Sequence, residues 1–145
     1  RPADETFACG LVRPLSAESL YRSMLIAGGH VPDDSGEFSG IDEGPYREAF
    51  AKVYPTLFPE TFSPRAAEGM FFTNNPLMNE IIASTFEALS PAEMVEEAFS
   101  QSFGRLPDDE EQAASLAFLG DAPDTQRRRS LLWALIASSE FRFNH

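Results

Sequence analysis

The run Leu131-Leu132-Trp133-Ala134-Leu135-Ile136-Ala137 is a strongly apolar stretch near the end of the chain. A helix that carries this run is apolar on every face, whereas a surface helix needs only one apolar stripe. The run therefore predicts a central helix that other helices surround. Its length falls far short of the roughly 20 apolar residues that span a bilayer, so we expect no membrane insertion.

Length and composition predict one globular domain with a single hydrophobic core. A chain of 145 residues removes roughly 70% of its unfolded surface from water when it folds, which is enough to sustain a core. The formal net charge of -12 argues against nucleic acid as a partner. Cys9 is the only cysteine, which excludes an internal disulfide and a zinc site built from several thiolates.

The first fourteen residues differ in character from the rest. Residues 1–14 contain Pro2, Gly10 and Pro14 and predict a linker or an N-terminal arm laid across the domain. Residues 15–145 are expected to form a single helical domain. Because the chain begins with Arg1 and shows neither a signal segment nor a transmembrane segment, we expect Arg1 to be a cut point inside a longer parent protein.

Two helices and a long loop are predicted between residues 15 and 55. Ser16 is a favourable N-cap for the first helix, which Gly28-Gly29 ends after a clear apolar stripe. Pro45 is expected to begin the second helix, which ends before Pro55. The acidic, glycine-rich segment His30–Gly44 between them is predicted to be a long loop, and loops of this length are either functional or loosely ordered.

Three proline-led helix starts follow, at Ser63-Pro64, Asn75-Pro76 and Ser90-Pro91. Each has a capping residue before a proline at the first helical position, where the missing N–H is one that the helix does not use. The second start leads into the stripe Leu77, Met78, Ile81, Ile82, Phe86 and Leu89, and the third into Met94, Val95, Ala98, Phe99 and Phe103.

The last three helices carry the clearest boundary signals. Ser90 with Glu93, and Asp108 with Glu111, have the spacing of a capping box. Gly104 and Gly120 are expected to end these two helices, the second of which has the stripe Ala113, Leu116, Ala117 and Leu119, and Asp124 to cap the final one. The short connections favour antiparallel neighbours. The fold class predicted is all-α, a compact bundle of about six or seven helices around a buried C-terminal helix, with one long acidic loop.

The end of the chain, from Leu131 to His145, closely resembles the ending of the planctomycete cytochrome-c-associated domain of unknown function. Three further stretches are similar to that family: Arg13–Leu20, Phe71–Leu77, and Phe103-Gly104-Arg105-Leu106-Pro107 with Glu111. Together they cover most of residues 11–145, while the His30–Gly44 loop departs from the family pattern.

The resemblance implies a context rather than a reaction. It implies an exported bacterial multidomain protein, located in the periplasm or at the cell surface, with this domain at its C-terminal end. It implies no catalytic residue and no cofactor in this domain, and any haem would lie elsewhere in the parent chain.

Two charged groups are candidate sites. The loop carboxylates Asp33, Asp34, Glu37, Asp42 and Glu43 have the oxygen ligands that calcium prefers, although the EF-hand spacing is absent and a solvated loop is the alternative. Arg127-Arg128-Arg129 lies where positive charge opposes the helix macrodipole, so we expect a compensating group. Carboxylates of the loop or of Glu93, Glu96 and Glu97 are the preferred candidates, and an anionic ligand or partner is the alternative.

The remaining singled-out residues are expected to be structural. Trp133 is predicted to lie in the core, and Glu140 and Asn144 to tie the tail back to it, because buried polar groups need hydrogen-bond partners. Arg105, in the step that resembles the family's helix-turn-helix, is also expected to be structural.

No catalytic constellation is apparent in the sequence, so the leading hypothesis is a non-catalytic helical module that packs against upstream domains or another protein. One alternative is an accessory part of a hydrolytic or redox enzyme site, which a pocket joining the His30–Gly44 loop to Arg127–Arg129 or Glu140 would favour. A second alternative is a calcium- or glycan-binding module.

Overall fold

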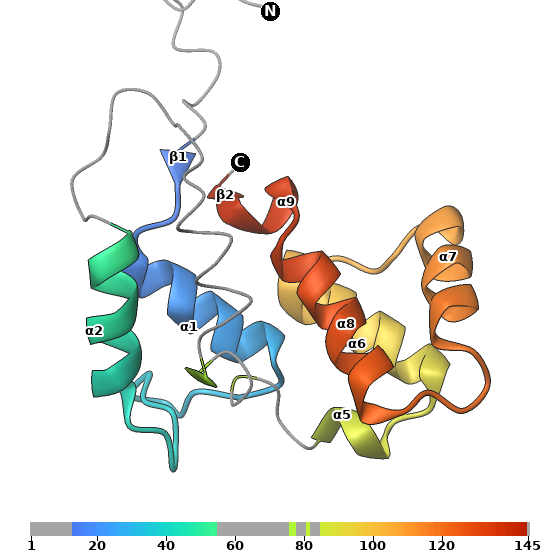
Figure 1. Ribbon diagram of the computed structural model, residues 1–145, viewed down its shortest axis with the longest axis horizontal. Coiled ribbons are helices and arrows are strands. Elements are labelled where there is room, and N and C mark those ends of the chain that lie inside the picture. Colours follow the sequence, from blue (N-terminus) through green and yellow to red (C-terminus); the bar gives the residue numbers. More distant parts are fainter. Residues whose placement is uncertain (1–12, 55–75, 78–80, 82–84, 145) are drawn as a thin grey trace, which may run out of the picture.

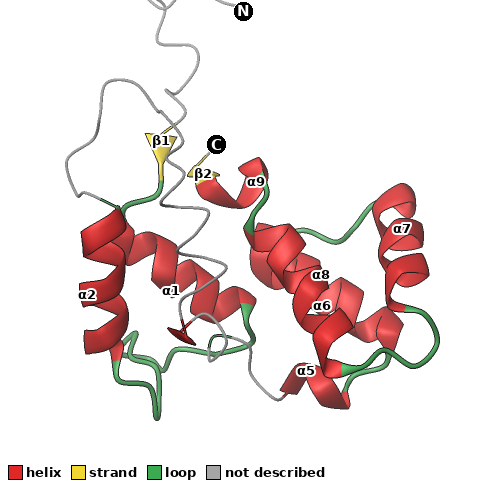
Figure 2. Cartoon of the chain, in the orientation of Figure 1, coloured by secondary structure: helices red, strands yellow, loops and turns green. Residues whose placement is uncertain are grey.

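The described part of the chain is all-α, as the sequence predicts (Figures 1 and 2). The computed structural model describes residues 13–54, 76–77, 81 and 85–144. The helices are α1 (Ala17–Ala27), α2 (Glu43–Val53), α5 (Thr85–Ala88), α6 (Pro91–Phe103), α7 (Asp109–Leu119), α8 (Thr125–Ile136) and α9 (Ser139–Arg142). Two strands of two residues each, β1 (Arg13–Pro14) and β2 (Phe143–Asn144), complete the described elements.

The helix α8 lies at the centre of the arrangement and contacts α1, α5, α6, α7 and α9. Figure 1 shows α1 and α2 on one side of the molecule and α6, α7 and α8 on the other, with α1 also contacting α6. β1 pairs antiparallel with β2, with Arg13 opposite Asn144. The start of the described chain is therefore held against its end, and Arg13 and Pro14 belong to the folded domain.

The loop between α1 and α2 is folded against α1. The Asp33 carboxylate accepts hydrogen bonds from the backbone N–H groups of Ser35 at 2.9 Å and Glu37 at 3.0 Å. Phe38 is buried, and the Arg22 guanidinium lies 5.3 Å from the centre of its ring while donating to the Gly36 carbonyl. The loop is therefore folded, while its carboxylates Asp33, Asp34, Glu37 and Asp42 remain exposed to solvent, in agreement with the solvated alternative.

The start of α2 differs from the prediction. The helix begins at Glu43, two residues before Pro45, because the Asp42 side chain caps it by accepting a hydrogen bond from the Gly44 N–H at 3.0 Å. Pro45 occupies the third helical position, where the N–H has no partner inside the helix and its loss costs little. The predicted end before Pro55 is confirmed, since α2 ends at Val53.

Capping residues set the boundaries of α1 and of α6 to α8. Ser16 caps α1 and Asp124 caps α8, and both capping boxes form, at Ser90–Glu93 and at Asp108–Glu111. Gly104 ends α6 at a φ of 68°, a left-handed conformation that side chains with a Cβ adopt only under strain. These predicted caps are confirmed.

The single helix expected from Pro76 to Leu89 is wrong. Pro76 and Leu77 are helical, but Ile81 is a bend, and α5 covers only Thr85–Ala88. Ile81 is buried with its carbonyl so close to Gly28 that any Cβ there would overlap it. Packing against the end of α1 thus overrides the helical period. The expected start at Ser63-Pro64 lies outside the described residues.

The face predicted for α7 is confirmed at Leu119 and, in part, at Leu116, but it is wrong at Ala113 and Ala117. Ala113 and Ala117 are exposed, whereas Ser115 and Leu119 are buried and Leu116 is half-buried. Alanine carries little apolar surface, so it does not decide which face of a helix turns inward, and Leu119 does.

The hydrophobic core consists of two clusters instead of the one expected. The first joins α1, α2 and the loop, and its large members include Tyr21, Met24, Phe38, Tyr46, Phe50 and Phe141 of α9. The second joins α5 to α8, with Phe86, Met94, Val95, Phe99, Leu119, Leu131 and Leu132.

The helix α8 contributes to both clusters. Leu132 belongs to the second cluster and Ile136 to the first, against which the half-buried Trp133 also packs, as predicted. Ala134 and Ala137 are exposed, so α8 is central without being enclosed on every side. Within the described ranges, no helix is both long enough and apolar enough to cross a membrane.

Candidate interaction surface

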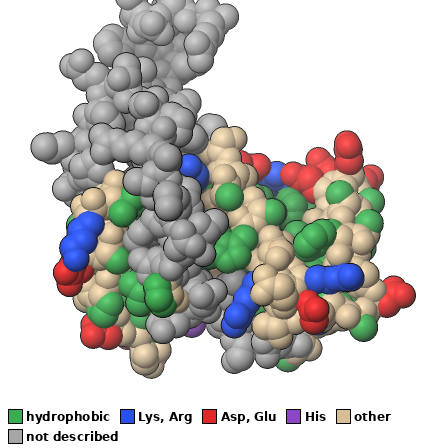
Figure 3. All heavy atoms as spheres, in the orientation of Figure 1, with side chains coloured by type: hydrophobic (Ala, Val, Ile, Leu, Met, Phe, Trp, Pro, Cys, Tyr) green, Lys and Arg blue, Asp and Glu red, His purple; other side chains and the backbone are tan. Residues whose placement is uncertain are grey.

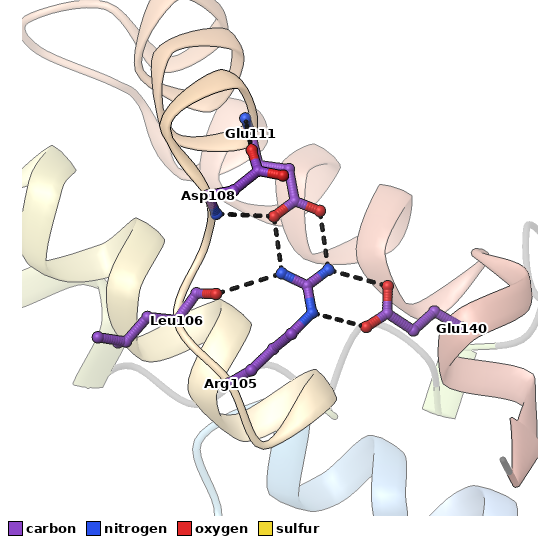
Figure 4. Close-up of polar contacts among 5 residues, drawn as sticks. All are labelled: Arg105, Leu106, Asp108, Glu111 and Glu140. Carbon is purple, nitrogen blue, oxygen red and sulfur yellow. Dashed lines mark hydrogen bonds and ion pairs between the residues drawn. The ribbon is translucent and has the colours of Figure 1, made fainter.

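Arg105, in the α6–α7 connection, bonds to the start of α7 and to α9, which lies 35 residues further along the chain (Figure 4). Its Nε and Nη2 donate to the two carboxylate oxygens of Glu140 in α9 at 2.8 and 2.9 Å. Nη1 and Nη2 donate to Glu111 in α7 at 2.7 and 2.8 Å, and Nη1 also donates to the Leu106 carbonyl at 3.2 Å. Arginine has five N–H donors, so each of them has a partner here and none is left for an anionic ligand.

The surroundings of Arg105 strengthen this structural role. The guanidinium lies 5.6 Å from the ring centre of Phe99 and 5.4 Å from that of Phe103, within the range of a cation–π contact. Hydrogen bonds from Arg105 are the main cause that lowers the pKa of Glu111 from 4.5 to about 2. Glu140 thus ties the end of the chain to the α6–α7 connection, which confirms its predicted role.

Asn144 holds the tail in a different way from Glu140. It lies in β2, opposite Arg13 of β1. The Leu15 N–H next to this pair donates to the Arg142 carbonyl at 3.2 Å. The described end of the chain is therefore held by backbone pairing as well as by the Glu140 carboxylate.

Arg127 and Arg128 at the start of α8 are compensated from inside the molecule, by carbonyls and not by the expected carboxylates. Arg128 Nη1 donates to the carbonyls of Phe86 at 2.7 Å and Leu89 at 2.9 Å, at the end of α5. Arg127 Nη1 donates to the carbonyl of Leu119, the last residue of α7, at 3.3 Å. Carbonyls at helix ends carry the negative pole of the helix dipole, so they replace the predicted acidic partners. Arg129 is half-buried.

The structure does not bring the five loop carboxylates together. Asp33 closes its own turn, Asp42 caps α2, and Glu43 accepts a hydrogen bond from the Tyr21 hydroxyl at 2.7 Å. Asp34 and Glu37 are exposed. In the described part of the chain, no three His, Cys, Asp or Glu side chains are grouped so that they would hold a metal ion.

Glu43 instead connects α1 to the start of α2. Its side chain is only 9% exposed and lies 3.7 Å from Arg22 Nη1 as well as accepting from Tyr21. Burial is the main cause that raises the pKa of Tyr21, and the hydrogen bond to Glu43 adds to it. The tyrosine therefore stays protonated and donates to the carboxylate.

An apolar groove of about 390 Å³ lies between α7 and α8. Figure 3 shows hydrophobic side chains reaching the surface in this region, with acidic side chains above them at the end where α7 begins. Phe99 and Phe103 of α6, Ala114 and Phe118 of α7, and Ala134 and Leu135 of α8 line it. Phe118 is 50% exposed, so a large aromatic side chain is available on the wall of this groove.

Glu111 and Glu140 line one end of the same groove. Because Arg105 bonds both of them, the Arg105 cluster also fixes the spacing between α7 and α9 at that end. The groove is thus bounded by rigid ion pairs and floored by core residues of α6 and α8.

A second groove, of about 490 Å³, lies between the end of α1 and α6. Glu93, Glu96 and Glu97 line it together with Val31, which is 77% exposed. Glu93 is engaged with Ser90 in its capping box. The second groove includes Val31 of the His30–Gly44 loop but neither Glu140 nor one of the three arginines. The first includes Glu140 but no described residue of the loop. Neither of these two grooves therefore joins the loop to those residues, as the enzyme alternative requires.

Comparison with known proteins found no matching family model, no matching curated protein and no matching solved structure.

The apolar groove is the feature that sequence reasoning missed. Ala114 and Phe118 lie outside the apolar stripe predicted for α7, and Phe118 is a large apolar residue with no assigned place in that stripe. An aromatic residue off the predicted face was the available signal. The groove itself depends on the angle between α7 and α8, which no local pattern contains.

Proposed function

We propose that this domain is a non-catalytic helical interaction module of a larger exported bacterial protein. The observation that carries the proposal is the open apolar groove between α7 and α8, with Phe118 half-exposed on its wall. Contiguous exposed apolar surface with a polar rim is typical of sites where another protein binds.

The charged groups of the domain support the same proposal. Arg105, Arg128 and Glu43 each make hydrogen bonds inside the fold, where they hold elements together. A catalytic side chain has to be able to reach a substrate. These three side chains are hydrogen-bonded to other groups of the same domain instead.

The wider context follows from the resemblance to the planctomycete cytochrome-c-associated domain. On that basis we propose an extracytoplasmic location and a place at the C-terminal end of a multidomain chain, with any haem in another part of the parent protein. The partners are then upstream domains or a separate protein.

A ligand screen tests the non-catalytic part of the proposal. Thermal unfolding of residues 1–145 is measured with calcium, transition metals, phosphate, sulfate and anionic oligosaccharides. A ligand present at about 100 times its dissociation constant adds about 2.7 kcal/mol to the native state. We expect no shift with any of them, and a reproducible rise of several degrees with one would replace the proposal with a ligand-binding or enzymatic site.

Hydrogen exchange tests the interaction part. Amide exchange in α7 and α8 is compared between residues 1–145 alone and the full-length protein in its native extract. We expect slower exchange at the groove in the native setting. Equal exchange in both samples would remove the support for an occupied groove.

A further inference from the structure

We infer that the groove between α7 and α8 binds a basic amphipathic helix that lies outside residues 1–145. This inference rests on the proposed function, since it names the chemistry of the partner for the same surface. It depends on three features of the described residues: the spacing of the apolar lining, the charge at the end of the groove, and the basic residues of the chain.

The spacing of the lining residues fits a helix. Ala114 and Phe118 lie four positions apart on α7, and Leu131, Ala134 and Leu135 lie three and four positions apart on α8. Each wall is therefore one ridge of a helix, and a third helix packs its own ridge between two such ridges. The small Ala114 and Ala134 let the backbone of an incoming helix approach closely.

The apolar floor of the groove requires that the helix face entering it is apolar too. Phe99, Phe103 and Leu135 are core residues that also line the groove. They offer no hydrogen-bonding side chain, so the face that enters has to present large apolar residues. An amphipathic helix supplies these at positions i, i+3 or i+4, and i+7.

The charge at one end of the groove determines which residues we expect on the flanks of the incoming helix. Asp109 and Glu110 are exposed in the first turn of α7, next to Glu111 and opposite Glu140 at the end of the groove. Arg105 bonds Glu111 and Glu140, and the exposed Asp109 and Glu110 add two further carboxylates in the first turn of α7, so this end is acidic. Lysine or arginine on the flanks of the incoming helix complements it and speeds association.

The described helices do not include one that is both basic and free to enter the groove. Among its 11 basic residues only Arg127, Arg128 and Arg129 are adjacent in sequence. Arg127 and Arg128 already donate to carbonyls at the ends of α7 and α5. The net charge of -12 also opposes the approach of a second copy. The basic helix is therefore expected from outside residues 1–145.

Peptide binding to residues 1–145 tests the inference directly. The probe is a capped peptide of about 15 residues, long enough for four helical turns, with leucines on one face and lysines on its flanks. Its binding is measured by calorimetry. We expect saturable one-to-one binding that weakens as salt is raised, because salt screens the charged flanks. A scrambled peptide of the same composition has the same charge but no apolar face, and we expect at least about tenfold weaker binding from it.

Two matched variants test whether the peptide binds in the groove. Ala114→Lys puts a charged side chain into the groove, whereas Ala113→Lys makes the same change at the neighbouring exposed position, which is outside the groove. We expect Ala114→Lys to weaken peptide binding by at least about tenfold and Ala113→Lys to change it less than about twofold. Equal effects of the two variants would overturn the inference, provided that both melt like the wild type.

Other results identify other occupants. A dimer of the free protein that Ala114→Lys dissociates would assign the groove to a second copy and overturn the basic-helix inference. Absence of peptide binding together with slow exchange at α7 and α8 in the native extract would also overturn it, while the proposed function would stand. If neither peptide binding nor slow exchange at α7 and α8 is observed, the basic-helix inference and the proposed interaction function are both overturned.

Discussion

The two hydrophobic clusters of this domain are built differently. The first, around α1 and α2, is aromatic, with the Tyr21 and Phe50 ring centres 5.8 Å apart, and its polar groups lie at the contact between the two helices. The second, around α6, α7 and α8, has capping boxes at two of its helices and the Arg105 cluster at its edge. The helices of the second cluster are thus delimited mainly by local sequence signals, whereas the first cluster is held together by contacts between residues distant in sequence.

The helix boundaries reflect this difference. In the second cluster, a cap and the residue three positions later bond each other, so the start of a helix follows from four consecutive residues. In the first cluster, Glu43 begins α2 while also bonding Tyr21 of α1. The start of α2 is nevertheless set locally by the Asp42 cap on Gly44, and the prediction misplaced it because Pro45 offered a competing start.

The largest expected effect comes from removing one large side chain from each cluster. Phe50→Ala and Leu132→Ala each empty a fully buried position, so we expect losses in unfolding free energy of about 3–5 and 2–5 kcal/mol, respectively. Urea unfolding is followed by Trp133 fluorescence, which reports on the first cluster, and by circular dichroism. Because α8 belongs to both clusters, we expect the two signals to change together in both variants.

Separate transitions for the two signals would show that the clusters unfold independently. In that case the contacts of α1 with α6 and α8 would be too weak to couple the two clusters, and each cluster would be a separate folding unit.

A smaller effect is expected at the contact between α1 and the Ile81 bend. Gly28→Ala places a Cβ into the Ile81 carbonyl, so we expect an overpacking cost of about 1–3 kcal/mol in a chemical denaturation experiment. Gly44→Ala is the control, because its Cβ would meet only the movable Asp42 carboxylate at 3.1 Å. A control loss as large as that of Gly28→Ala would mean that the Ile81 contact is not the cause.

The smallest effect is expected from the ion pairs of Arg105, because the side chains of Arg105 and Glu111 are 38% and 31% exposed. The folded pKa of Glu111 is about 2, below its usual 4.5. A lowered carboxylate pKa stabilises the protein above pH 4.5, and this contribution is lost as the pH falls toward 2. Urea midpoints of the wild type and Arg105→Gln are therefore expected to differ at neutral pH and to converge in acid. A constant difference across this range would assign the effect of Arg105 to packing on Phe99 and Phe103 instead.

Much of the fold was predictable because its signals are local. The all-α class, the bounds of α1 and α6, and the caps Ser90, Asp108 and Asp124 follow from the periodicity and capping chemistry of neighbouring residues. The structural roles of Glu140 and Arg105 were also expected, although their hydrogen bonds to each other were not.

Four features needed the tertiary structure: the division of the core, the bend at Ile81, the carbonyl partners of Arg128, and the groove beside Phe118. Each of them depends on how two elements distant in sequence approach one another. Helical period and capping specify where a helix lies along the chain, because they involve residues within one turn. The relative placement of helices comes from side-chain packing between them, and that packing decides which apolar residues are buried and which remain available to a partner.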